Sequence, residues 1–137
     1  MSGFKDMAAG LKTRLETVVG LMVYDHPPDV VNSFPAAIIL PEPLDPEMVL
    51  DDSFWTARFR AVFLVASGED SAGFSSLYSL LKPGASAGPI QAIRQGRTLG
   101  GAADDCDAVA VENIGRRELW GNLYFGFDLV VEALKST

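Results

Sequence analysis

Residues 54–66 read Phe-Trp-Thr-Ala-Arg-Phe-Arg-Ala-Val-Phe-Leu-Val-Ala, and this stretch decides the class of fold. The odd positions from Trp55 to Val65 are all apolar, whereas the even positions begin polar, with Arg58 and Arg60, and finish apolar. Alternation with a period of two is typical of a strand that buries one face. We therefore predict a long strand whose second face becomes buried toward its end.

Three further strands are predicted on either side of it. Residues 34–40 form a short apolar run closed by prolines, residues 107–114 alternate, and residues 119–131 alternate again after an Asn-Ile-Gly turn. The last of these exceeds the usual strand length, so Gly121 or Gly126 is expected to bend it. The four strands are expected to pair as two hairpins.

Apolar residues recur at helical spacing in three segments. Residues 4–22 form the first, with Gly20 as its stop; residues 74–81 form the second; and a short helix through residues 89–93 ends at Gly96. The order is α-β-β-α-α-β-β. The expected fold is therefore α+β, with a mainly antiparallel four-stranded sheet of two hairpins and helices on one face.

Composition narrows the class of protein. The 137 residues suit one domain, so residues 1–137 are expected to form a single unit. Eleven Lys and Arg against eighteen Asp and Glu give a net charge of −7, which disfavours electrostatic binding to nucleic-acid phosphates. One cysteine and one histidine argue against a disulfide scaffold and a multi-histidine metal site. No signal peptide and no membrane span are predicted.

No catalytic, cofactor-binding or metal-binding residue is predicted, and no enzyme activity is expected. The acidic run at residues 104–107 has no standard metal-ligand spacing, so a solvated loop that protects a sheet edge is favoured. Cys106, beside three carboxyl groups, should resist forming a thiolate. One alternative stays open, an acidic metal-assisted enzyme. Its residues would be Asp25, His26, Asp104 and Asp107.

One face of the sheet has the composition of an interface between proteins. If the odd positions of residues 119–131 pack on the helices, Trp120 and Tyr124 lie on the opposite face with Arg58 and Arg60. Aromatic residues and arginines are enriched in protein interfaces. These four residues are therefore candidates for subunit contact, and the alternative is that the rings only cover the outer face of a monomer.

The chain resembles the tail terminator proteins of bacteriophages with long, non-contractile tails, a family also called minor tail or head-tail joining proteins. The resemblance consists of the order of the helices and strands and of short apolar sequence segments along nearly the whole chain. It is carried by the opening helix, residues 20–25, residues 34–41, the strand 54–66, the helix with Leu77 and Leu81, residues 89–93, residues 99–101 and residues 120–124.

The resemblance implies a structural role. Members of the family are α+β proteins that assemble as a hexameric ring on the tail tube, stop its polymerisation and dock to the head connector. It implies partners: further copies of the chain, the major tail tube protein and a connector or stopper protein. It also implies a place in the neck of the virion, after assembly in the host cytoplasm.

DNA would then pass through the lumen of the ring without specific binding, and an acidic wall suits this because it repels phosphate. The candidates for lumen or tube contact are acidic residues of two segments. They are Glu42, Asp45, Glu47, Asp51, Asp52, Asp104, Asp105 and Asp107. Two further alternatives stay open: a head-completion or stopper protein of the neck, and a cytoplasmic adaptor that binds small ligands or peptides on its sheet.

Overall fold

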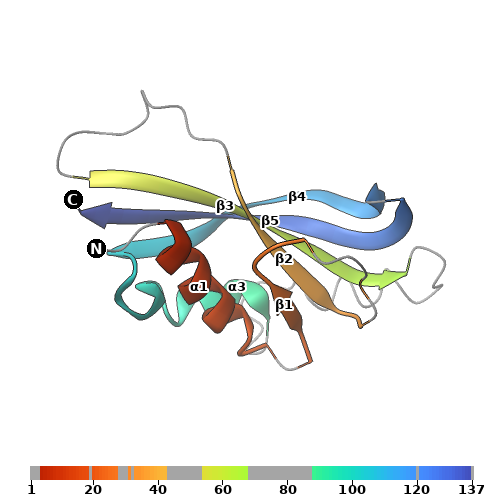
Figure 1. Ribbon diagram of the computed structural model, residues 1–137, viewed down its shortest axis with the longest axis horizontal. Helices are drawn as coiled ribbons and strands as arrows, with labels where there is room; N and C mark the ends of the chain where they lie inside the picture. The colour runs from red at the N-terminus through yellow and green to blue at the C-terminus, as the bar shows by residue number, and fades with distance from the viewer. Residues whose placement is uncertain are drawn as a thin grey trace.

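The computed structural model describes residues 4–18, 20–27, 31, 33–42, 54–67, 88–119 and 121–136. Two helices, a short 3-10 helix and five strands lie in these ranges (Figure 1). In chain order they are α1 (Phe4–Leu15), β1 (Met22–Tyr24), β2 (Ala36–Pro41), β3 (Phe54–Ser67), α3 (Pro89–Arg94), η2 (Leu99–Gly101), β4 (Asp105–Leu119) and β5 (Asn122–Ser136). The helix expected over residues 74–81 lies outside the described residues.

The α+β class is confirmed, but the sheet has five strands instead of four and is mixed. Its strand order is β1-β2-β3-β5-β4. Both expected hairpins are present, since β2 pairs antiparallel with β3 and β4 pairs antiparallel with β5, and β3 joins them by pairing with β5. The fifth strand is β1, which pairs parallel with β2. Its three residues are too few to show the alternation of a strand, so the sequence does not predict β1 or its parallel pairing.

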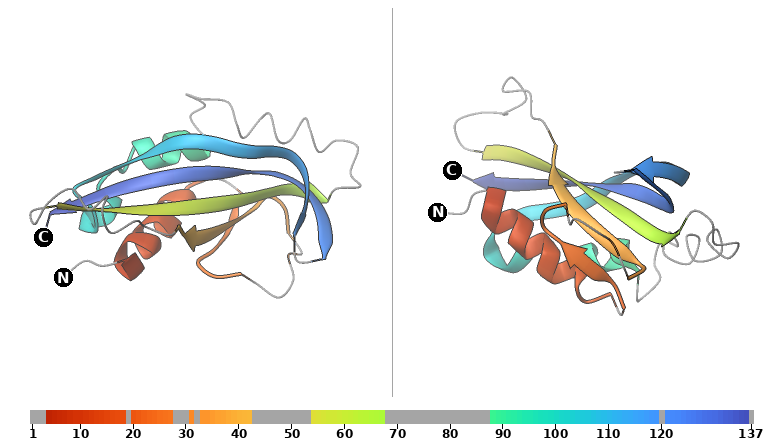
Figure 2. Two further views of the ribbon diagram at one scale, coloured as in Figure 1. Left: turned by 90° about the horizontal axis from the view of Figure 1, so that it is seen from above. Right: turned by 45° about the vertical axis from the view of Figure 1, so that its right-hand side comes forward.

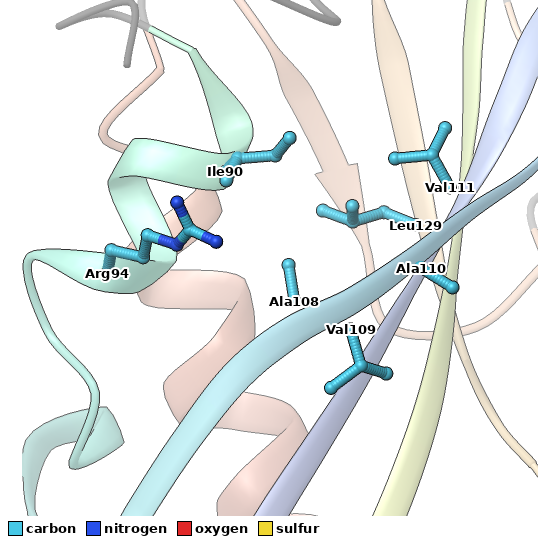
Figure 3. Close-up of a pocket in the computed structure, with 7 residues that line it drawn as sticks. All are labelled: Ile90, Arg94, Ala108, Val109, Ala110, Val111 and Leu129. Carbon is cyan, nitrogen blue, oxygen red and sulfur yellow. The ribbon is translucent and has the colours of Figure 1, made fainter. Parts of the chain in front are cut away.

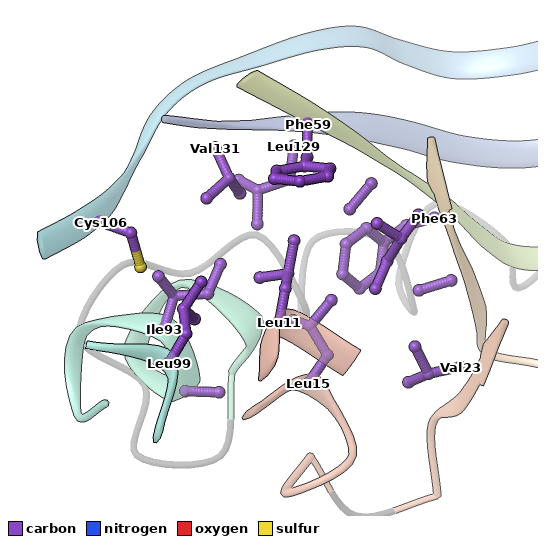
Figure 4. Close-up of a cluster of buried hydrophobic side chains, with 14 of the residues drawn as sticks. Leu11, Leu15, Val23, Phe59, Phe63, Ile93, Leu99, Cys106, Leu129 and Val131 are labelled. Carbon is purple, nitrogen blue, oxygen red and sulfur yellow. The ribbon is translucent and has the colours of Figure 1, made fainter. Parts of the chain in front are cut away.

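The helices α1 and α3 cover one face of the sheet, as expected (Figures 1 and 2). The odd positions of β3 from Ala57 to Val65 and of β5 from Phe127 to Ala133 point toward them, and the rings of Phe63 and Phe127 stack with centroids 4.7 Å apart. Leu11 and Leu15 of α1 and Ile93 of α3 complete this core (Figure 4). Burial of these apolar side chains is the main stabilising contribution to the fold.

The first helix ends earlier than its apolar pattern suggests. α1 stops at Leu15, and the backbone N–H groups of Thr17 and Val18 donate to carbonyls three residues back. This tighter hydrogen bonding is common at helix ends. Gly20 then has φ +81°, a left-handed conformation that suits glycine and turns the chain toward β1.

Residues 113–115 do not form the hairpin turn that the sequence predicts. β4 continues through them to Leu119, and the turn to β5 contains Gly121, with φ +82°. Asn113 and Gly115 have φ values of 54° and 123°, and the register with β5 shifts between Glu112 and Gly115. Turns and β-bulges both use residues that tolerate positive φ. The Asn-Ile-Gly pattern therefore correctly indicates positive φ at these residues, but the element that they form is a bulge within β4 and not a turn between two strands.

Candidate functional site on the open face and edges of the sheet

The face of the sheet opposite the helices has an ionic network at its centre. Asp128 of β5 is 1% exposed, yet its carboxylate accepts hydrogen bonds from three side chains. Arg60 Nη1 lies 2.9 Å from Asp128 Oδ2, and Asn113 Nδ2 lies 2.8 Å from the same oxygen. Arg117 Nη1 donates to Asp128 Oδ1. Three strands therefore meet at one buried carboxylate.

Arg60 extends the network to two more carboxylates. Its Nε donates to Glu42, and its Nη2 lies 2.9 Å from Glu112 Oε1. The hydrogen bond to Glu42 is the main cause that raises the pKa of Arg60 above its ordinary value, and Asp128 and Glu112 add to it. Among the described residues, no buried side-chain polar atom lacks a hydrogen-bond partner. The network is thus fully satisfied, which is the condition under which buried charge is tolerated.

Arg58 lies on the same face but in a different setting. Its Nη2 is 3.3 Å from Glu132 Oε2, and the two side chains are 43% and 36% exposed. Such a pair contributes little to stability, since water screens it. Of the two arginines predicted as contact residues, Arg58 is therefore the one available to a partner, whereas Arg60 is occupied by its own chain.

Two aromatic residues, Tyr124 and Trp120, were also predicted as subunit contacts. Tyr124 faces away from the helices, as expected, but it is buried among Ile38, Val62 and Leu64, and its ring lies 6.0 Å from that of Phe34. The alternative, that this ring covers the outer face within one chain, therefore accounts for Tyr124. Trp120 lies outside the described residues.

The acidic candidates for the lumen also occupy different settings. Glu42 belongs to the Arg60 network, and its backbone N–H donates to the carbonyl of Arg58. Asp105 and Asp107 pair with Arg97 and Arg94 of the segment that precedes β4, and Asp104 is exposed beside them. Asp45, Glu47, Asp51 and Asp52 lie outside the described residues.

Asp105 makes stability depend on pH. Arg97 donates two hydrogen bonds to it, at 2.7 and 3.0 Å, which is the main cause that holds the pKa of Asp105 below its ordinary 3.8. A carboxyl whose pKa is lower in the folded state stabilises the fold above its unfolded pKa, and this contribution disappears as the pH falls through the folded pKa.

Asp105→Asn should therefore slightly lower the urea concentration at the midpoint of unfolding at pH 7. Near about pH 2 the Asp105 carboxyl is protonated in both the folded and the unfolded protein, so the substitution should leave the midpoint unchanged there. Because the pair is exposed, about 1 M salt should shrink the difference at pH 7. A difference that persists in acid would show that Asp105 acts through packing instead of charge.

Two clusters named for the metal-dependent alternative lie far apart in the fold. Asp25 and His26 follow β1, with His26 Nδ1 2.7 Å from Asp25 Oδ1, whereas Asp104 and Asp107 lie at the start of β4. β1 and β4 are the two opposite edges of the sheet. Within the described ranges, no group of three or more His, Cys, Asp or Glu side chains is placed to hold a metal ion.

Cys106 is a buried core residue, 3% exposed, with its sulfur directed toward α3 (Figure 4). Burial is the main cause that raises its pKa to about 11, and Asp105 adds to it. At pH 8 only about one thiol in a thousand would be ionised. We expect an aromatic disulfide reagent to react with the native thiol at least about a hundredfold more slowly than with the urea-unfolded thiol. Equal rates would show that the start of β4 opens readily.

Exposed apolar side chains lie at the margins of the sheet. Met22 on β1 is 47% exposed, and Val109 and Ile114 on β4 are 50% and 55% exposed. Phe34 and Leu123 are also exposed and lie beside the starts of β2 and β5. The two strands at the outer edges thus each display large apolar side chains to solvent, Met22 on β1 and Val109 and Ile114 on β4.

The β4 residues are displayed by β-bulges. Register with β5 shifts between Ala108 and Ala110 and again between Glu112 and Gly115, so Val109 and Ile114 are both left out of the pairing. A bulge turns a side chain in a new direction and interrupts an edge that another strand would otherwise extend. Alternation alone does not reveal where the register slips, so the bulge at Val109 is not predictable from the sequence, and the Asn-Ile-Gly segment at residues 113–115 indicates a turn instead of a bulge.

Comparison with known proteins adds no assignment. No protein-family model matches the chain, and no curated protein is significantly similar to it. In the part of the chain that the structure describes, neither helix has the length and apolar character needed to cross a membrane. The functional proposal therefore depends on the resemblance and on the surfaces described above.

Proposed function

We propose that the chain is a structural protein of a phage tail, a tail terminator whose copies form a ring on the tail tube and join the tail to the head connector. The observation that carries the proposal is the exposure of apolar side chains on two opposite edges of one sheet, Met22 on β1 and Val109 and Ile114 on β4. Two different contact surfaces on one chain produce a head-to-tail interface. Such an interface closes into a ring when its rotation allows.

The arrangement supports further parts of the proposal. Phe34 and Leu123 at one end of the sheet offer a third exposed apolar region, which suits contact with another component along the tail axis. The net charge of −7 suits a lumen through which DNA slides, since a basic wall would retain phosphate. A hexamer remains the stoichiometry that the resemblance implies.

Two measurements test the proposal together. Sedimentation of the purified chain over a range of concentrations should show a species several times the 14.7 kDa of one chain, and electron microscopy should show it as a ring. Antibody labelling of particles from the phage that carries this gene should mark the head-proximal end of the tail. Label on the head of tailless particles would favour the stopper protein. Absence of the chain from purified particles would contradict both.

Charge reversal at Arg58 tests whether the open face takes part. Arg58→Glu should cost less than about 1 kcal/mol of folding stability, because its pair with Glu132 is exposed. If this face contacts a neighbour, the variant should sediment as a smaller species than the unmodified chain at equal concentration. Unchanged sedimentation would remove the open face from the interface. Arg60 does not suit this test, since its charge is part of the buried network.

A further inference from the structure

The seam between α3 and β4 is incompletely packed. A shallow hollow of about 160 Å³ lies between the helix and the strand (Figure 3). Ile90 and Arg94 line it from α3, and Val109 and Val111 line it from β4. The hollow is several times the roughly 30 Å³ that one water molecule occupies, so the side chains around it lose dispersion energy that close contact would give. Apolar packing therefore contributes little to holding α3 against β4 at this part of the seam.

Two ion pairs close the same seam. Arg94 Nε lies 3.2 Å from Asp107 Oδ1, and Arg97 donates to both carboxylate oxygens of Asp105, at 2.7 and 3.0 Å. The arginines belong to the end of α3 and the residues just after it, and the aspartates belong to the start of β4. The four side chains are 32% to 51% exposed, so dissolved salt screens both pairs. We call these two pairs the clasp.

A buried thiol lies directly behind the clasp. Successive side chains of a strand point to opposite faces, so Cys106 points inward between the two outward aspartates. Its side chain is 3% exposed and belongs to the same core cluster as Ile93 of α3 and Leu99 of η2 (Figure 4). Residues 89–103 thus cover the thiol, and separating them from β4 would expose it.

The other side of this segment is attached to α1 by contacts that involve no ion pair. Arg14 Nε donates to the carbonyl oxygen of Ala92 at 3.0 Å. Gly10 packs so closely on Leu99 that a Cβ at this glycine would lie 2.5 Å from the Leu99 carbonyl oxygen. Movement of the segment is therefore expected at its β4 side, with the contacts to α1 as the pivot.

We propose that residues 89–103 form a lid that opens from β4 while staying attached to α1, and that the clasp sets how often it opens. Native proteins open locally at a lower free-energy cost than that of complete unfolding, and a seam with a packing defect is a suitable place for it. Opening would expose Cys106 and the apolar side chains of β4 that line the hollow. High salt should favour it. The proposal is independent of the ring.

The labelling rate of Cys106 tests the lid. The rate with an aromatic disulfide reagent is divided by the rate of the same variant unfolded in urea, so that the ratio measures opening alone. The double variant Asp105→Asn/Asp107→Asn should raise this ratio about fivefold, the combined effect of two exposed ion pairs. About 1 M salt should raise it similarly in the unmodified chain and hardly at all in the double variant.

Asp25→Asn is the matched control. It makes the same chemical change in another exposed pair, that of Asp25 with His26, which follows β1 at the opposite edge of the sheet. The labelling ratio should stay at the value of the unmodified chain. An increase equal to that of the double variant would show that loss of any surface carboxylate has this effect, and the clasp would be wrong.

The double variant Arg94→Gln/Arg97→Gln separates opening from a change in the thiol itself. Asp105 and Asp107 raise the pKa of Cys106, whereas Arg97 lowers it. An effect on thiol ionisation alone would therefore change labelling in opposite directions in the aspartate and arginine variants. Release of the clasp accelerates labelling in both, and opposite changes would contradict the proposal.

Low concentrations of urea separate opening of the lid from complete unfolding. Opening exposes little new surface, so the labelling rate should depend only weakly on urea below the unfolding transition. If the rate instead follows the full urea dependence of global unfolding in the unmodified chain and in both double variants, Cys106 is reached only through unfolding and residues 89–103 are not a lid.

Discussion

Asp128→Asn should lower the free energy of unfolding by about 3 kcal/mol, the range found when one partner of a buried ion pair is removed. The substitution keeps the shape of the side chain but removes the charge that Arg60 and Arg117 share, and it turns an amide N–H₂ toward a guanidinium. Asp128 itself is 1% exposed, so water cannot replace what is lost. Urea denaturation followed by circular dichroism measures the change.

Glu132→Gln is the matched control for this experiment. It makes the same chemical change on the same strand and face, four residues later, but its partner Arg58 is 43% exposed and reaches water. We expect a cost of about 0.5 kcal/mol there. Similar costs for the two variants would mean that the Asp128 network is no more important than a surface ion pair.

The network also makes rearrangement of the open face costly. Arg60 connects Glu42, at the end of β2, with Glu112 on β4 and Asp128 on β5. The connection spans four adjacent strands, because β3 and β5 lie between β2 and β4. A partner that displaced Arg60 would leave the buried Asp128 carboxylate with Arg117 and Asn113 alone and would remove the arginine that Glu42 contacts, and weakening a buried ion pair is costly. Contacts at the sheet edges avoid this cost.

The sequence predicts the core of this fold well because the core depends on local periodicity. The alternation in residues 54–66 assigned Phe59 and Phe63 to the helix-facing side, and both are buried there. Helical spacing located α1 and α3 in the same way. One-sided burial repeats at a fixed interval along each element, so a single chain carries enough information to recognise it.

The features that the sequence does not reveal depend on register. Asp128 and Arg117 stand out only once β4 and β5 are aligned, with Glu112 opposite Asp128. A one-residue slip would send these charges to the opposite face. The two bulges at Val109 and Ile114 also depend on the register between β4 and β5. Nothing in the sequence distinguishes Arg117 from a surface arginine, although it donates to a buried carboxylate.

Gly126→Ala should be as damaging as the loss of Asp128, for a steric reason. Gly126 lies in β5 opposite Leu64 of β3 and Gly115 of β4. A methyl group there would overlap the carbonyl oxygen of Phe63 and lie 3.1 Å from its carbonyl carbon. The obstacle is the backbone of a central strand, which cannot rotate away as a side chain could. We expect a loss of about 3 kcal/mol, the upper part of the usual range for overpacking.

Gly121→Asn is the control, since it replaces a glycine in the turn just before β5. An added Cβ there meets no atom within 4 Å, and asparagine tolerates the left-handed φ of +82° better than other residues with a side chain. Its cost should stay below about 1 kcal/mol, read from the same urea curves. If Gly126→Ala proved as mild as Gly121→Asn, β3 and β5 would have to be farther apart at Phe63 than this structure places them, and the register between the two hairpins would need revision.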